Sequence, residues 1–351
     1  MKPWEKYFRK VEPYVPGEQP KLSKMIKLNT NENPYPPSAK VERALKEADW
    51  ERLKMYPDPT SEILVKELAK QYGVQDDQVF VGVGSDDVLG MAFLTFFGSD
   101  KPIVFPDITY SFYDVWAELF QIPYKTPALD ENFRIVKEDY YEANGGVIIT
   151  NPNAPTSIYE DLDFIRDILE HNQDVVVIVD EAYIDFGGKS ALELLLEYEN
   201  LLVVQTFSKS RSMAGMRIGY AFGNPSLIKA LNDVKYSYNS YTMDYLTLLT
   251  GVASLQDETY FEQCCEKIIA TRERVKKELK ELGFSFPDSK TNFLFVTHER
   301  VPAAELFEAL RKENIFVRYF NKPRIDNRLR ITIGTDEEMD ALLEFLRKYL
   351  L

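Results

Sequence analysis

Short apolar runs alternate with helical patterns between residues 79 and 222, and this alternation is the clearest structural signal in the chain. Several runs are rich in valine and isoleucine and lack the polar alternation of a strand with one face in water. The runs are VFVGV (79–83), PIVF (102–105), GVIIT (146–150), DVVVIVD (174–180), LLVVQTF (201–207) and RIGYAFG (217–223). Strands buried on both faces predict a largely parallel sheet that is covered by helices.

The segments before this region have a different pattern. Residues 1–37 are rich in proline and polar residues, which predicts an irregular arm with one short strand near 26–28. The patterns at 38–49 and 60–72 predict helices. A long helical region follows the sheet at about 225–282 and ends at Gly283, a helix-stop signal.

The last third of the chain alternates strand and helix patterns. Strands are expected at 291–297, 315–320 and 329–334, and helices at 302–313 and from about 336. We expect an N-terminal arm (1–37), a large α/β domain (38–240) and a smaller α+β C-terminal domain (241–351). Two domains also fit the length of 351 residues, at roughly 150 residues per domain.

Composition limits the partners of the protein. With 42 basic and 56 acidic residues the net charge is −14, so we expect no general binding of nucleic acid or of anionic membranes. No apolar run approaches the roughly 18 residues of a membrane span, and the N-terminal residues lack the apolar core of a signal peptide. The adjacent Cys264 and Cys265 suggest no disulfide framework and a reducing compartment. We therefore expect a cytoplasmic protein, and we expect no metal site.

Polar side chains follow the predicted strands one after another. In an open parallel sheet, ligands bind outside the carboxyl ends of the strands, so these residues are candidates for a site. They are Gly84, Ser85 and Asp86, then Tyr110, the loop NPNAPTS at 151–157, Asp180 with Tyr183, and Ser208 with Lys209.

Asp180 and Lys209 stand at the ends of successive predicted strands. A partly buried carboxylate at position 180 needs a partner, and a ring nitrogen that must stay protonated would suit it; a helix cap is the alternative. A desolvated amine at position 209 would be nucleophilic toward an aldehyde, whereas most lysines are simply solvated. Arg217 follows Lys209 by eight residues and could pair with a phosphate, unless it is an ordinary surface arginine.

Two further elements suit a flat, phosphate-bearing ligand. The amides of Ser85 and Asp86 would open a helix after a glycine turn, and a helix N-terminus binds phosphate, although Asp86 could equally be a plain cap. The ring of Tyr110 could stack on a planar cofactor or could be an ordinary core aromatic.

As a set, these motifs resemble the class I/II aminotransferases, which are pyridoxal-phosphate enzymes of fold type I. The SxK…AGxRxGY segment (208–220) with the upstream DEAY (180–183) is highly specific, and the resemblance covers nearly the whole chain. It implies a mostly parallel seven-stranded sheet between helices. Within the family, the motifs LNTNENPYPPS, MYPDPT and LRITIGT make the chain most similar to histidinol-phosphate aminotransferases.

The resemblance assigns roles around pyridoxal 5′-phosphate. Lys209 would bond covalently to the cofactor, Asp180 would pair with its pyridinium nitrogen, and Tyr183 would contact its phenolic oxygen. Tyr110 would stack on the ring. The remaining contacts, mainly to the phosphate, would come from Gly84, Ser85, Asp86, Thr206, Ser208 and Arg217. Tyr56 would reach the phosphate of a neighbouring subunit, which implies a homodimer with shared sites.

The resemblance also implies the substrates. Arg330 would clamp an α-carboxylate, and Arg318, Tyr14 and Asn33 would contact the substrate, histidinol phosphate. The amino group would pass in a ping-pong reaction between glutamate/2-oxoglutarate and histidinol phosphate/imidazole-acetol phosphate, with Lys209 as acid and base. Alternatives on the same scaffold are an aromatic-amino-acid aminotransferase and a decarboxylase of phosphorylated amino acids. A protein of this fold without catalysis is a third alternative.

One position departs from the family pattern. Where the family loop usually reads Asn-Pro-Thr-Gly, this chain has Ala154 and, at the glycine, Ser157. The family asparagine contacts the phenolic oxygen of the cofactor. We expect Asn153 or Asn151 to replace that contact if the loop shifts; otherwise Tyr183 acts alone.

Overall fold

The computed structural model describes residues 2–22 and 24–350, and it contains two sheets. Residues 1, 23 and 351, which the predicted arm and C-terminal domain include, lie outside the described residues. The larger sheet has seven strands in the order β2-β8-β7-β6-β5-β3-β4. They span Val79–Gly82 (β2), Gly219–Gly223 (β8), Leu201–Thr206 (β7), Val177–Asp180 (β6), Val147–Thr150 (β5), Ile103–Val104 (β3) and Tyr124–Lys125 (β4).

Only β8 runs against the other strands of this sheet. It pairs antiparallel with β2 and β7, whereas the pairs from β7 to β4 are parallel. The expected parallel, seven-stranded sheet is therefore present, with one reversed strand. The short β4 was not among the predicted strands, because its two residues, Tyr124 and Lys125, are exposed and have no apolar pattern.

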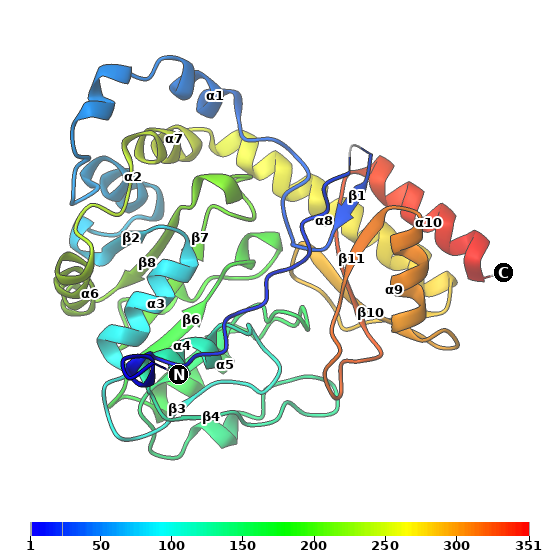
Figure 1. Cartoon of the computed structure of the whole chain (residues 1–351), viewed down its shortest axis with the longest axis horizontal. Coiled ribbons are helices and arrows are strands. Elements are labelled where there is room, and N and C mark those ends of the chain that lie inside the picture. The colour runs from blue at the N-terminus through cyan, green and yellow to red at the C-terminus, as the bar shows by residue number, and fades with distance from the viewer. Residues whose placement is uncertain (1, 23, 351) are drawn as a thin grey trace.

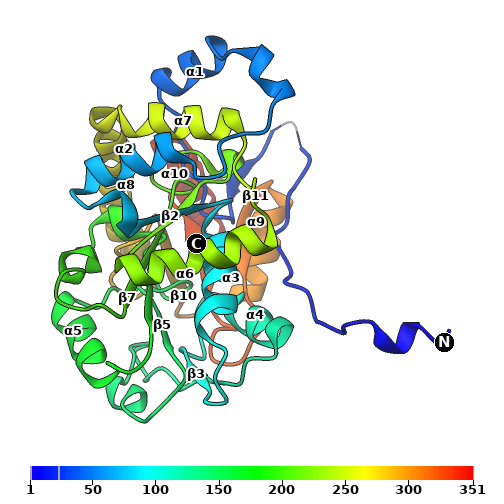
Figure 2. The same cartoon turned by 90° about the vertical axis from the view of Figure 1, so that its left-hand side faces the viewer.

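Helices cover both faces of the large sheet (Figure 1, Figure 2). Alternate strand residues point to opposite faces, so each face has its own apolar cluster. One cluster joins the sheet to α2 (Glu62–Tyr72), α5 (Leu162–His171) and α7 (Tyr245–Leu255). The other joins it to α3 (Ser85–Phe96), α4 (Tyr113–Phe120) and α6 (Pro225–Tyr238).

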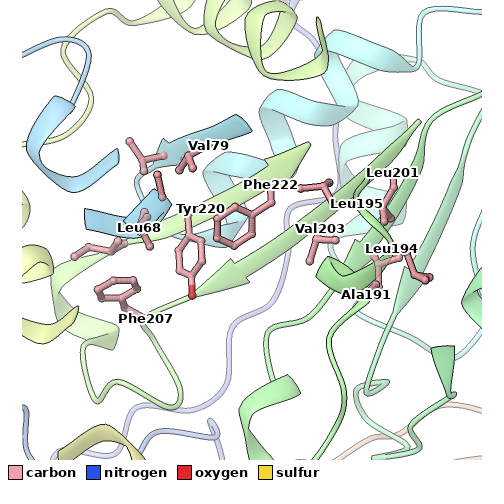
Figure 3. Packing of buried hydrophobic residues seen from close by; sticks show 14 of the residues in the cluster. Leu68, Val79, Ala191, Leu194, Leu195, Leu201, Val203, Phe207, Tyr220 and Phe222 are labelled. Carbon is pink, nitrogen blue, oxygen red and sulfur yellow. The ribbon is translucent and has the colours of Figure 1, made fainter. Parts of the chain in front are cut away.

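Figure 3 shows part of the first cluster, with Tyr220 and Phe222 of β8 beside Val203 of β7. The buried apolar strand residues explain why the runs lacked polar alternation: both faces of the strands are covered. Each buried aliphatic or aromatic side chain of this kind contributes roughly 1.5–3 kcal/mol to folding. The strand ends are therefore held rigidly, which positions the side chains that follow them.

The smaller sheet has the order β1-β11-β12-β10-β9 and lies beside α9 (Ala303–Lys312) and α10 (Asp336–Leu350) (Figure 1). Its strands are Ile26–Leu28 (β1), Ile315–Tyr319 (β11), Leu329–Thr332 (β12), Phe293–His298 (β10) and Phe284–Ser285 (β9). β1 comes from the N-terminal arm and pairs parallel with β11. The arm is thus attached to the smaller sheet.

The predicted helical region at 225–282 consists of three helices, α6, α7 and α8 (Glu258–Glu281). α7 packs on α1 (Ala39–Lys46) and α2, so its side chains belong to the core of the large sheet. α8 continues toward the smaller sheet, where α9 (Ala303–Lys312) and α10 (Asp336–Leu350) also pack. The domain boundary near residue 240 stays a prediction, and the packing of α7 favours a boundary after that helix.

Several single 3₁₀ turns connect these elements. They lie at Glu5–Tyr7, Trp50–Lys54, Asp76–Gln78, Lys137–Tyr140, Ile184–Phe186, Ala191–Leu194 and Ala214–Met216. Among the helices that the structure describes, none is both long and apolar enough to cross a membrane.

Candidate active site

The predicted strand-end residues meet at one edge of the large sheet. Because β8 runs against its neighbours, its first residue, Gly219, lies opposite the last residues of β7 and β2, Thr206 and Gly82. A cavity of about 420 Å³ opens at this edge, and both sheets and the arm contribute to its walls. The predicted site residues in its lining are Tyr14, Asp86, Tyr110, Tyr183, Lys209, Arg217, Arg318 and Arg330.

Asp180 ends β6, is 3% exposed and is not part of the cavity lining. Its carboxylate accepts hydrogen bonds from Tyr113 Oη (2.7 Å) and from the amide of Ala182 (3.2 Å). It does not cap a helix, because the next helical turn begins at Ile184 and has Tyr183 at its N-cap. Burial raises the pKa of Asp180 to about 6, and the hydrogen bond from Tyr113 opposes this shift. A protonated ring nitrogen would relieve the cost of this buried charge.

Lys209 lies three residues after the end of β7 and faces the arm. Its Nζ donates a hydrogen bond to the carbonyl oxygen of Thr30 (3.2 Å) and lies 5.7 Å from the centre of the Tyr183 ring. The amine therefore sits in the cavity that loops of the large sheet and the arm help to line. This placement suits a nucleophile better than it suits a solvated surface lysine.

The arm residue Asn33 lies beside Lys209 but not in the cavity lining. Its Nδ2 donates to the main-chain carbonyls of Lys209 and Ser210, each at 3.0 Å, and its Oδ1 accepts from the amide of Tyr35. These bonds occupy the amide of a side chain that the resemblance assigns to substrate binding. The structure instead gives Asn33 the geometry of a support for the loop that carries Lys209.

The start of α3 and Arg217 form a positively polarised corner of the cavity. Gly84 caps α3 with φ +85°, a backbone conformation that favours glycine, and the absence of a Cβ leaves room for the guanidinium of Arg217. The free amides at the helix start and the guanidinium suit a phosphate. Asp86 pairs with Arg217 (3.3 Å) and is not the cap of the helix, because Gly84 occupies the N-cap position.

Hydroxyl groups at the end of β7 complete this corner. Thr206 Oγ1 donates to Ser208 Oγ at 3.0 Å, and Ser208 Oγ also accepts from Arg217 Nη1 at 3.4 Å. The amide of Ser208 donates to Thr206 Oγ1 (3.1 Å). The structure therefore brings the predicted phosphate ligands together.

Two tyrosines form the aromatic wall of the cavity. Tyr110 donates a hydrogen bond to Asp86 Oδ1 (2.8 Å), and burial and the nearby Asp86 carboxylate raise its pKa well above the usual value. Tyr14 of the arm stacks on Phe112 with ring centres 4.1 Å apart. Burial also raises the pKa of Tyr14, although Arg318 and Arg330 oppose the shift. Both phenols remain neutral hydrogen-bonding groups at neutral pH.

Arg318 and Arg330 lie side by side on the antiparallel strands β11 and β12. Neither forms an ion pair with any acidic side chain in residues 2–22 and 24–350. Among the described residues, Arg330 donates only to the carbonyl of Asn29 (3.1 Å), and its Nε has no hydrogen-bond partner. Burial lowers the pKa of Arg330. Like charges directly opposite one another destabilise a sheet. Two adjacent arginines without an acidic partner at a cavity therefore predict an anionic ligand, which would offset their repulsion.

The loop that departs from the family pattern keeps its asparagines away from Tyr183. Asn153 donates to Ile108 O and Thr156 Oγ1 and accepts from Thr109 Oγ1, at 2.7–2.9 Å. Asn151 exchanges hydrogen bonds with the main chain of Glu160, both at 2.8 Å. These contacts occupy both side-chain amides, and Ala154 presents only a methyl group to the cavity.

Tyr56 does not reach the site of its own chain. It is 82% exposed and stacks on Tyr241, with ring centres 4.7 Å apart. This exposure agrees with a contact to a neighbouring subunit, but a single chain does not test that prediction.

Two site residues were not foreseen from the sequence. Tyr113, which holds Asp180, follows the recognised Tyr110 by three residues and reads as a core aromatic. Asn31 donates to Tyr183 Oη (2.9 Å) from a completely different segment. The motif LNTNENP contained both Asn31 and Asn33, but nothing in the sequence distinguished their directions.

Taken together, the side chains fit the cofactor that the resemblance implies. A planar pyridine aldehyde with a phosphate group would find an amine in Lys209, a buried carboxylate in Asp180 and an anion corner at Arg217. The unpaired Nε of Arg330 leaves a donor for a carboxylate beyond the ring.

Comparisons with known proteins agree with this geometry. Residues 23–346 match the family model described as aminotransferase class I and II. The chain is 53% identical over 346 residues to a histidinol-phosphate aminotransferase of Clostridium acetobutylicum, covering 98% of both chains. It is 52% identical over 347 residues to a histidinol-phosphate aminotransferase of Lactococcus lactis subsp. cremoris, covering 99% of this chain and 98% of the other.

Among solved structures, the fold is similar to that of histidinol-phosphate aminotransferase from Sinorhizobium meliloti in complex with pyridoxal-5′-phosphate. The TM-score is 0.83 at 23% sequence identity, over 93% of this chain and 92% of the other. This likeness supports the fold, whereas the family rests on the sequence matches.

Proposed function

The chain belongs to the class I and II aminotransferase family, and we propose that it is a histidinol-phosphate aminotransferase that uses pyridoxal 5′-phosphate. It would exchange an amino group between glutamate/2-oxoglutarate and histidinol phosphate/imidazole-acetol phosphate. The observation that carries the substrate assignment is the unpaired pair Arg318 and Arg330, which suits an anionic substrate. Relatives of more than 50% identity carry the same name.

When bound, the cofactor would supply a carbonyl carbon for the substrate amine and a ring that can accept electrons from the substrate carbon. Asp180 holds a proton on the ring nitrogen, because its buried carboxylate has no other cationic partner within salt-bridge distance in the part of the chain described. In the first half-reaction, Lys209 Nζ would take the proton from the Cα of the amino donor and deliver it to the aldehyde carbon of the cofactor. In the second half-reaction it would carry a proton from that carbon to the Cα of the other substrate. Arg217 and the start of α3 hold the phosphate in place.

Arg330 and Arg318 divide the substrate between them in this proposal. Arg330, whose Nε is buried without a hydrogen-bond partner among the described residues, binds the α-carboxylate of glutamate. Arg318 lies next to Tyr14 at the cavity wall and binds the phosphate of histidinol phosphate. The two half-reactions therefore depend on different arginines.

The variant Arg318→Gln tests this division. We expect the KM for histidinol phosphate to rise about 10- to 100-fold, the scale of a lost charged hydrogen bond, while the KM for 2-oxoglutarate changes much less. Steady-state kinetics with each substrate varied in turn measures both values. Arg311→Gln is the matched control, because Arg311 forms only an exposed pair with Glu18. Equal losses for both substrates would count against the division.

We also propose that the active form is a homodimer in which Tyr56 reaches the cofactor phosphate of the neighbouring subunit. The exposed ring of Tyr56 supports this idea. So does the N-terminal segment, which extends away from the body of the chain and exposes Trp4, Tyr7 and Phe8 (Figure 2). Exposed apolar groups of this kind are typical of surfaces that contact another chain.

Tyr56→Phe should weaken cofactor binding about tenfold, because it removes one hydrogen bond to a charged phosphate. A fluorescence titration of the apoprotein with pyridoxal 5′-phosphate measures the Kd. Tyr238→Phe, an exposed tyrosine on α6, serves as the control. A holoenzyme that sediments as a fully active monomer would refute the shared site. The cytoplasmic location stays a prediction from the sequence.

A further inference from the structure

Asn31 of the N-terminal arm is aimed at the side chain that faces the predicted cofactor oxygen. It is 1% exposed and has a left-handed backbone with φ +57°. Its Nδ2 donates a 2.9 Å hydrogen bond to Tyr183 Oη, and Tyr183 lines the cavity beside Lys209. A buried asparagine in this conformation is rarely placed without a specific contact to satisfy.

The side-chain amide of Asn31 has its Nδ2 toward Tyr183 and its Oδ1 toward Thr332. Thr332 Oγ1 accepts from the main-chain N–H of Asn31 and donates to its Oδ1, both at 3.0 Å. The main-chain carbonyl oxygen of Asn31 accepts from Asn292 Nδ2 (3.0 Å). With Oδ1 facing Thr332 Oγ1, the group that meets Tyr183 Oη is the Nδ2 donor.

This contact sets the direction of the tyrosine hydroxyl. Because Tyr183 Oη accepts from Asn31, its own O–H remains free to donate into the cavity. Donation to one side of a hydroxyl also strengthens the hydrogen bond that it donates on the other side. Ala154, which also lines the cavity, has no polar side-chain group, and the amides of Asn151 and Asn153 are bound elsewhere.

We propose that Asn31 is a positioning residue for the cofactor: through Tyr183 it supplies the hydrogen-bonding support that position 154 lacks in this chain. This inference rests on the proposed function, because it concerns the phenolic oxygen of bound pyridoxal phosphate. The arm thereby contributes to the electronic state of the cofactor, in addition to its place in the smaller sheet. Asn31 acts through Tyr183 and does not itself contact the reacting atoms.

The experiment follows the visible absorbance of the resting holoenzyme as a function of pH. A hydrogen bond to the phenolic oxygen stabilises its negative charge and so favours loss of the proton from the nitrogen that joins Lys209 to the cofactor. In Asn31→Gly, which removes the amide and suits the left-handed backbone, the pH midpoint should rise by about 0.5 to 1 unit. Asn31→Asp, which keeps the shape but replaces the donor with an acceptor, should raise it as well.

Two further variants separate this role from a general loosening of the arm. Asn29→Ala removes another buried arm amide, one that donates to Glu18 O and does not reach Tyr183, and it should leave the midpoint unchanged. Ala154→Asn in the Asn31→Gly background should bring the midpoint back toward the wild-type value. Any of three results overturns the inference. They are a wild-type midpoint in both Asn31 variants, an equal shift in Asn29→Ala, and a midpoint that does not return when Ala154→Asn is added to Asn31→Gly.

The proposed function fails separately, and the wild-type protein alone tests it. If wild-type protein with pyridoxal phosphate shows no pH-dependent visible band, the function is wrong and the variants are not needed. If it shows the band and Asn31 does not influence the midpoint, only the role of Asn31 is wrong.

Discussion

Replacing Lys209 with alanine is expected to abolish transamination, with kcat at least about 10³-fold lower, because the residue supplies both the covalent anchor and the proton-transferring amine. No neighbouring amine is placed to substitute for it among the described residues that line the cavity, where Lys209 is the single lysine. The variant should still bind pyridoxal phosphate through Arg217 and the start of α3. The visible absorbance band that depends on a bond to the lysine should disappear.

Absorbance spectra and single-turnover kinetics of the reconstituted variant measure both effects. Lys229→Ala is the matched control, since Lys229 forms only an exposed pair with Asp233. Retention of the visible band and of activity in Lys209→Ala would assign the chemistry to another residue. Loss of cofactor binding together with the band would instead indicate a folding defect, which thermal denaturation of the apoprotein distinguishes.

Asp180→Asn is expected to reduce kcat roughly 10²- to 10³-fold, because an amide does not hold the ring nitrogen in its protonated state as a carboxylate does. The substitution should fit the site. Its Oδ1 can still accept from Ala182, and the hydroxyl of Tyr113 can turn to donate to Thr150 Oγ1, which lies 2.6 Å away. Kinetics with a saturating cofactor concentration separate this effect from weaker cofactor binding. An Asp180→Asn enzyme with wild-type kcat would contradict the role of the carboxylate.

The same variant should make the apoprotein more stable at pH 7. The folded pKa of Asp180 is raised to about 6 from 3.8, so the folded state binds the proton more tightly than the unfolded state does. The stability of the wild-type apoprotein therefore falls as the pH rises from about 4 to 6, by about 3 kcal/mol in total. In Asp180→Asn no carboxyl group titrates at this position, so this loss of folding stability does not occur.

Urea unfolding of both apoproteins at several pH values measures the difference. Glu181 is a neighbouring buried acid whose pKa burial raises to about 7, so it contributes its own pH dependence. That contribution is common to wild type and variant, and the difference between their unfolding free energies isolates Asp180. If the difference between the two unfolding free energies is the same at pH 4 and pH 7, burial does not raise the pKa of Asp180.

Much of the fold could be predicted because its signals are local. The Val/Ile-rich strands, such as 177–180 and 201–206, have an apolar pattern that burial on both faces requires. The chemistry at the strand ends followed from the same pattern, since parallel strands bring their carboxyl ends to one edge. The two-residue strand β4 had no such signal, and the reversal of β8 is a property of the pairing rather than of its sequence.

The site was less predictable where contacts join distant segments. Asn31 and Asn33 are two residues apart, yet one faces Tyr183 and the other binds the main chain at Lys209. Their directions depend on the positive φ of Asn31 and on its bonds to Thr332, some 300 residues away in the sequence. The unpaired state of Arg318 and Arg330 likewise depends on the pairing of β11 with β12. Sequence periodicity carries no information of this kind.

The substrate of the first half-reaction tests the central claim most directly. The purified holoenzyme is mixed separately with histidinol phosphate, phenylalanine, tyrosine and O-phosphothreonine, and the loss of the visible cofactor band is followed in a stopped-flow spectrometer. We predict that histidinol phosphate bleaches the band fastest and that no carbon dioxide is released, with the rate depending on Arg318. A faster response to phenylalanine or tyrosine, or carbon dioxide release from a phosphorylated amino acid, would contradict the assignment.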